Sequence, residues 1–145
     1  MLTNNFVGYL RNGKDSIANV IRENGDQIDA GLGTSSEKTF KVSIGTGTTN
    51  VKKTDYKLES IISSGYTASV EEKIINAPST TDTSMYSIVT NITNTSSSET
   101  IQFSEIGLFV YQNTYGFRYM IAREVFDAPI TLAPGETKSF VLKLF

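Results

Sequence analysis

Residues 85–93 read Met-Tyr-Ser-Ile-Val-Thr-Asn-Ile-Thr, and the alternation in this segment is the clearest indication of the fold class. Its β-branched residues favour a strand, and both faces of that strand carry apolar side chains because neighbouring residues alternate. From Pro78 to Ser98 the only charge is Asp82. An exposed strand with so little charge would aggregate. We therefore expect it to lie at the centre of a sheet or beneath another chain.

Similar alternation recurs on both sides of this stretch, with turn residues between the segments. The further strands that we expect are Phe40–Ile44, Val70–Ile75, Thr100–Tyr111, Phe117–Val125 and Ser139–Phe145. Residues 58–62 fit either a short helical turn or a strand. The spacing of the turns indicates a mainly β chain, with an antiparallel β-sandwich of jelly-roll or immunoglobulin-like form.

The first 30 residues follow a different pattern. Polar capping residues precede apolar residues at helical spacing, and Asn24-Gly25 is a stop signal. We expect a short helical arm over residues 1–30 and the sandwich domain over residues 31–145. The apolar residues that this arm would present are Phe6, Tyr9, Leu10, Ile17, Val20 and Ile21. An alternative is a β-hairpin that pairs 17–21 with 26–30.

Four glycines are expected to shape turns or close contacts. The Gly-Thr-Gly-Thr segment at 45–48 lacks the lysine that a phosphate-binding loop needs. We expect a tight turn there, in which Gly45 and Gly47 adopt positive φ. Gly107 interrupts an apolar strand, which indicates a β-bulge or a close backbone approach. Gly135 follows a proline, which predicts a type II turn.

The composition argues against an enzyme. The 145 residues include no histidine and no cysteine, so the chain lacks the commonest general base, the commonest transition-metal ligand and the thiolate nucleophile. We expect no catalysis, no cofactor and no metal. A glycosidase needs two carboxylates that face one cleft, and the sequence cannot place any two of them together. Glu105 is expected to be partly buried in a structural ion pair with Arg118 or Arg123.

The charge pattern gives no sign of nucleic acid or membrane as a partner. The formal net charge is −2, and no apolar run approaches the length of a membrane span. Lys52, Lys53 and Lys57 form the nearest basic cluster, but Asp55 and Glu59 lie among them. Short clusters of mixed charge are usually solvated, so we expect this one to be a solvated loop.

Aromatic residues gather around one predicted turn. They are Tyr111, Tyr115, Phe117 and Tyr119. Core packing is the default expectation for such residues. A contact surface is the sharper hypothesis, because tyrosine is favoured where one end of the side chain stays wet.

Three blocks of the sequence, taken in order, resemble the tail-collar and fibre-attachment proteins of bacteriophages. The first is Leu2-Thr3-Asn4-Asn5 ahead of a short helix. The second is Phe40 to Thr49 with its Gly-Thr-Gly turn, followed by Asp55 and Leu58. The third is Ser104-Glu105-Ile106-Gly107-Leu108-Phe109, then Met120 to Phe126, Leu132 to Gly135 and a final strand.

This resemblance implies a virion protein that is assembled in the cytoplasm of the host bacterium. It would form or anchor a head fibre or tail fibre by contacting capsid, collar or fibre subunits. The chain ends at Phe145 inside its last expected strand, which favours a short adaptor, a head-fibre base or a decoration subunit. We expect a closed symmetric homo-oligomer, a trimer, with residues 1–24 docked on a neighbour.

Two other functions remain open from the sequence. A carbohydrate-binding module for host-surface glycan would need an exposed aromatic platform between Tyr111 and Tyr119. A histidine-free polysaccharide hydrolase would need working carboxylates such as Glu105 and Glu124.

Overall fold

The computed structural model describes residues 1–6, 19–29, 38–74, 86–112 and 116–143. By its contacts the chain divides into two compact units. The first unit comprises Met1–Ser63 and Gln102–Ile130, and the second comprises Ser64–Ile101 and Thr131–Phe145. Within the described ranges, no helix has the length and hydropathy to cross a bilayer.

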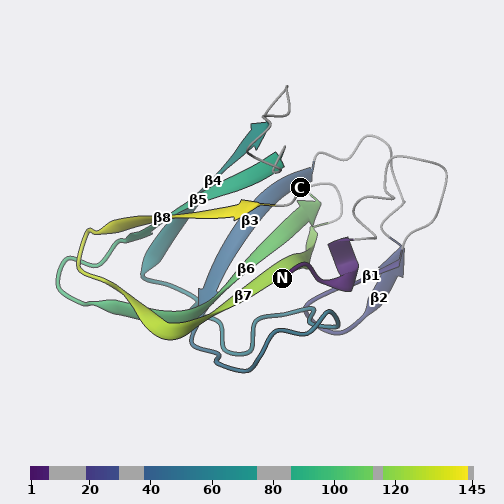
Figure 1. Ribbon diagram of the computed structural model, residues 1–145, viewed down its shortest axis with the longest axis horizontal. Coiled ribbons are helices and arrows are strands. Elements are labelled where there is room, and N and C mark those ends of the chain that lie inside the picture. The colour runs from purple at the N-terminus through teal and green to yellow at the C-terminus, as the bar shows by residue number, and fades with distance from the viewer. Residues whose placement is uncertain (7–18, 30–37, 75–85, 113–115, 144–145) are drawn as a thin grey trace, which may run out of the picture. The chain divides into compact units, whose positions relative to one another are not determined.

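Strands dominate both units, as the alternating sequence predicts (Figure 1). There are two antiparallel sheets of three strands each, with the strand orders β3-β6-β7 and β4-β5-β8. The mainly β, antiparallel fold class is therefore confirmed, and it is consistent with a β-sandwich.

The sheet of the first unit contains β3 (Lys38–Gly45), β6 (Ile101–Gln112) and β7 (Phe117–Leu132), although the ends of β6 and β7 reach into the second unit. The register of β3 and β6 runs without a break from Lys38 opposite Gln112 to Gly45 opposite Glu105. The predicted strands 100–111 and 117–125 are thus confirmed, and β7 continues further than predicted.

Gly107 lies opposite Ser43 inside this unbroken register, so a bulge is the wrong alternative. A Cβ atom at Gly107 would lie 2.8 Å from Cδ2 of Leu58 and 2.9 Å from Cε2 of Phe109. Gly107 is therefore needed because it leaves room for the side chains of Leu58 and Phe109 to pack against the backbone. Leu58, Phe109 and Met120 form a buried cluster at this position.

Both outer edges of this sheet are covered where the chain crosses them. Leu2 forms an isolated bridge with Ala122 of β7, and Thr3 N donates to Ile121 O at 2.9 Å. On the other side, Ile61 bridges Gly45 at the end of β3. Residues 58–62 thus contribute an extended bridge rather than a helical turn. Bridges of this kind cover part of each edge against pairing with other chains.

The sheet of the second unit contains β4 (Tyr66–Ile74), β5 (Tyr86–Asn94) and β8 (Thr137–Lys143). The strand β5 matches the alternating segment of residues 85–93, and it lies between the other two. The expected central position is confirmed. In the turn before β8, Glu136 N donates to Ala133 O at 3.0 Å and Gly135 has a φ of 73°, as a type II turn requires.

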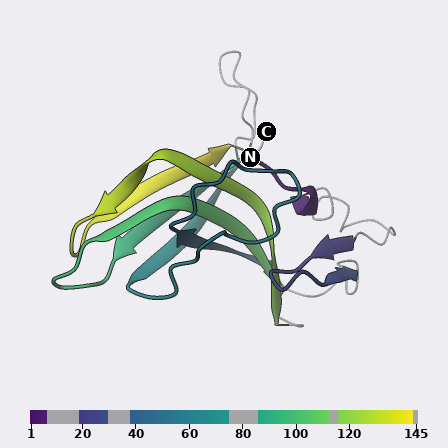
Figure 2. The same ribbon diagram turned by 90° about the horizontal axis from the view of Figure 1, so that it is seen from below.

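The expected N-terminal helical arm is largely wrong in the residues that the structure describes. Of the described residues in this region, only 4–6 form a helical turn. The strands β1 (Asn19–Ile21) and β2 (Gln27–Asp29) pair antiparallel and form the alternative hairpin. Figures 1 and 2 show the two strands side by side. Val20 and Ile21 fit both periodicities, and the Asn24-Gly25 turn favours the hairpin. Gly25 has a φ of 89°.

Candidate functional site

A buried polar site in the first unit is centred on Glu105 of β6, whose side chain is 0% exposed. Its Oε1 atom accepts hydrogen bonds from the backbone N–H groups of Gly47 at 3.1 Å and Ser60 at 2.9 Å. Its Oε2 atom accepts from Glu59 N at 3.1 Å and from Arg123 Nε at 2.9 Å. A buried carboxylate is stable only with such partners, and these four donors meet that need.

Arg123 of β7 provides the compensating charge and is only 3% exposed. Its Nη2 atom lies 2.8 Å from Glu105 Oε2, and its Nη1 atom donates to Asp55 Oδ2 at 2.8 Å. Burial by itself lowers the pKa of Arg123, but the hydrogen bonds to Asp55 and Glu105 outweigh it and raise that pKa overall. The predicted ion pair of Glu105 is therefore confirmed with Arg123 as its partner.

Glu59 lies at the rim of the site and is partly exposed. Its Oε2 atom accepts from Thr49 N at 3.0 Å, Thr49 Oγ1 at 2.8 Å and Thr48 N at 2.9 Å. Arg123 Nη2 lies 3.7 Å away. The hydrogen bonds from the Thr49 backbone and hydroxyl are the main cause that lowers the pKa of Glu59; desolvation opposes them, and Thr48 and Arg123 add to them.

Gly45 and Gly47 are needed here for space, and the expectation that they adopt positive φ is wrong. A Cβ atom at Gly45 would lie 2.5 Å from Glu105 Oε1, and one at Gly47 would lie 2.6 Å from the same atom. Any side chain at either position would push against the buried carboxylate. The Gly-Thr-Gly segment is therefore shaped by its approach to Glu105.

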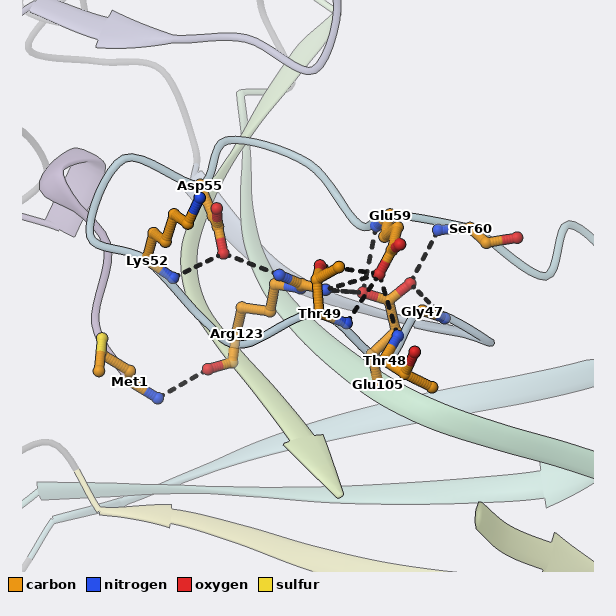
Figure 3. Close-up of polar contacts among 10 residues, drawn as sticks. All are labelled: Met1, Gly47, Thr48, Thr49, Lys52, Asp55, Glu59, Ser60, Glu105 and Arg123. Atoms are coloured by element: carbon orange, nitrogen blue, oxygen red, sulfur yellow. Dashed lines mark hydrogen bonds and ion pairs between the residues drawn. The ribbon is translucent and has the colours of Figure 1, made fainter. Parts of the chain in front are cut away.

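Together these contacts fix residues 46–60 onto the sheet of the first unit. Figure 3 shows that this loop turns Asp55 and Glu59 toward Arg123, while Glu105 reaches the backbone of Gly47 and Ser60. Both oxygens of Glu105 are engaged by backbone or guanidinium groups. The arrangement can hold a loop rigidly, and it leaves Glu105 no exposed oxygen with which to exchange a proton with a substrate.

Arg118, the other predicted partner of Glu105, makes different contacts. Its guanidinium forms a two-point ion pair with Glu23, with Nε–Oε2 at 2.6 Å and Nη2–Oε1 at 2.9 Å. Its Nη1 atom donates to Ser43 Oγ at 3.0 Å, and its Cζ atom lies 4.2 Å from the centre of the Phe109 ring. Arg118 thus ties the turn of the β1–β2 hairpin to β7.

The roles of Asp55 and Glu59 were not predicted from the sequence. The prediction placed both residues with the neighbouring lysines in a solvated loop. All three of those lysines are exposed, as expected, whereas Asp55 faces Arg123. The Thr48 and Thr49 donors to Glu59 were also missed. The only signal was the position of Asp55 and Leu58 in the second block of the resemblance.

The predicted contact residues do not form one exposed surface. Phe6, Val20 and Tyr119 are buried, whereas Ile21, Tyr111 and Phe117 are partly exposed. The others, Tyr9, Leu10, Ile17 and Tyr115, lie outside the described residues. A role of this set in partner binding stays a prediction.

The described residues contain no cluster of three or more acidic side chains placed to hold a metal ion. Comparison of the chain with protein-family models, with curated proteins and with solved structures finds no match in any of the three.

Proposed function

We propose that this protein is a structural component of a bacteriophage virion, a short adaptor that forms or anchors a head or tail fibre. It would act without catalysis, by associating with copies of itself and with capsid, collar or fibre subunits. A closed trimer is the expected form, as such assemblies are usually symmetric.

The observation that carries this proposal is that the blocks of the resemblance meet at one site. Gly47 and Asp55 come from the second block, and Glu105 and Arg123 come from the third. These four residues are joined by hydrogen bonds or ion pairs. Residues quoted from separate blocks of the resemblance thus contact one another in the folded chain. Such contacts give the blocks a shared structural reason, which supports the resemblance.

The same geometry favours a scaffold over the two alternatives. Of the aromatic residues expected to form a glycan platform, Tyr119 is fully buried, and Tyr111 and Phe117 are only partly exposed. A hydrolase that used Glu105 as an acid or base would need an oxygen free for proton transfer, and the two oxygens of Glu105 already accept four hydrogen bonds. Incubation with bacterial polysaccharide should therefore release no oligosaccharide from wild type beyond that from Glu105→Gln.

The direct test of the proposal uses phage particles purified from lysates of the source culture. An antibody raised against the recombinant chain should detect it in fractions that sediment with particles, and gold labelling should mark one location on them. Detection of the chain only among free proteins would contradict the proposal.

A further inference from the structure

The strand β4 is attached to the rest of its sheet along one edge only. It is the first strand in the order β4-β5-β8, and within the described residues no strand lies on its other side. None of its described side chains, from Tyr66 to Lys73, is buried. This contrasts with β3 and β7, whose outer edges are bridged by Ile61 and Leu2.

Hydrogen bonds beside β4 show which of its backbone groups point outward. Asn94 N donates to Glu136 O, on the β8 side of β5, whereas Thr95 N donates to Gly65 O, on the β4 side. Antiparallel strands alternate residues that face the neighbour with residues that face away. With Tyr66 opposite Asn94, the outward-facing backbone groups include those of Ala68, Val70 and Glu72. Within the described residues these three have no backbone partner on that side.

The charges of β4 favour a second β4 as the partner. Residues 66–70 are uncharged, and all charges lie in Glu71, Glu72 and Lys73. Parallel pairing in register would place each glutamate opposite its own copy, which is unfavourable. Antiparallel pairing centred on Val70 places the charged half of each strand opposite the uncharged half of the other.

This register also fits the backbone. Centred on Val70, it pairs Val70 with Val70 of the second copy and Ala68 with Glu72, so that all three outward-facing residues meet outward-facing residues. Glu71 then lies opposite Ser69 of the second copy. Centring on Glu71 or Glu72 instead would oppose two identical carboxylates.

We infer that the free edge of β4 is a self-association surface, on which β4 of a second copy pairs antiparallel about a two-fold axis at Val70. The inference rests on the proposed function and specifies one of its contacts. The two sheets would continue as one sheet of six strands. A two-fold contact of this kind joins two trimers into a closed hexamer.

The test uses like-charge repulsion at the axis. In Val70→Lys and in Val70→Glu, each substituted residue would face its own copy, so each variant alone should show at least a tenfold weaker association at this contact. An equimolar mixture should recover the wild-type mass. Ser69→Lys is the matched control, because its added charge would face Glu71 of the second copy and should preserve association. Light scattering after size exclusion gives the masses, and circular dichroism checks that each variant is folded.

The outcomes separate the inference from the proposed function. An even-numbered wild-type oligomer that is halved by each Val70 variant and restored by mixing supports the inference. A wild-type oligomer that both variants leave unchanged, or that mixing fails to restore, overturns the inference and leaves the proposed function standing. A wild type that is a single chain at every concentration overturns both.

Discussion

At the scale of single residues, Glu105 links the sheet of the first unit to the loop that crosses it. Three of its hydrogen-bond donors are backbone N–H groups of residues 46–60, and the fourth is Arg123. Loss of the charge at Glu105 would leave a guanidinium that is 3% exposed without one of its two counter-charges at 2.8 Å. Uncompensated buried charges are among the most destabilising defects in proteins.

The substitution Glu105→Gln should therefore lower the free energy of unfolding by about 3 kcal/mol. Glutamine keeps the size of the side chain, so the loss would reflect charge and hydrogen bonding rather than a cavity. Urea unfolding followed by circular dichroism measures it. Glu124→Gln, at an exposed position of the same sheet, is the control and should stay within about 0.5 kcal/mol of wild type. Equal stability of the two variants would contradict the structural role of Glu105.

Gly47→Ala should destabilise the protein by about 1–3 kcal/mol, because the added methyl group would overlap Glu105 and Glu59. Gly135→Asn is a suitable comparison. Nothing lies within 4 Å of a Cβ atom at Gly135, and asparagine tolerates positive φ. Thermal unfolding should show a larger drop in unfolding temperature for Gly47→Ala than for Gly135→Asn. A larger loss at Gly135 would count against the crowding around Glu105.

Stability should also fall in acid through Glu59. Its pKa in the folded protein is lowered, so the folded state favours the ionised form. The stability that ionised Glu59 contributes is complete above the ordinary glutamate pKa of about 4.3. It is lost as the pH falls through the lowered pKa that Glu59 has in the folded protein. Urea midpoints of wild type should therefore drop more steeply below about pH 5 than those of Glu59→Gln. Parallel pH profiles would exclude this role of Glu59.

The sequence predicts these residue roles unevenly. Glu105 stands between a serine and an apolar run, which is enough to predict partial burial and an arginine partner, although the side chain is in fact fully buried. Asp55 and Glu59 lie in a polar loop beside lysines, and only the folded chain shows that they face Arg123. Positive φ at Gly45 and Gly47 was expected from local turn chemistry. The tertiary approach of Glu105 is the actual reason for both glycines.

At the scale of elements, the strands from Phe40 onward follow the period of two, and the sequence predicts most of them. The N-terminal region is harder, because Val20 and Ile21 fit a helix and a strand equally well. The hairpin is also held by contacts with residues that are distant in the sequence. Asn5 accepts a hydrogen bond from Ile21 N and donates to Ile21 O, each at 2.8 Å, and Glu23 pairs with Arg118.

Asn5→Ala should loosen this hairpin while leaving the sheets intact. The loss of two hydrogen bonds to Ile21 would cost about 1–2 kcal/mol locally. Backbone amides at 19–29 should then exchange with solvent roughly ten times faster. Hydrogen–deuterium exchange read by mass spectrometry measures this, and Asn50→Ala in the exposed loop is the control. Unchanged exchange at 19–29 would show that Asn5 does not hold the hairpin.

At the scale of the whole molecule, the sequence predicts the mainly β class because its alternation is long and its turns are regular. It does not predict the division into two units, which depends on how the sheets and loops contact one another. One unit has both sheet edges bridged by its own chain, whereas in the described residues no strand or bridge lies on the outer edges of β4 and β8 in the other. Proteins usually blunt such edges, so an uncovered one fits a protein that assembles.

The mass of the purified protein in solution tests that account most directly. Size exclusion with light scattering, run over a hundredfold range of concentration, should give a discrete particle of three or six chains of 15.9 kDa each. A stable mass of one chain at every concentration would contradict the account.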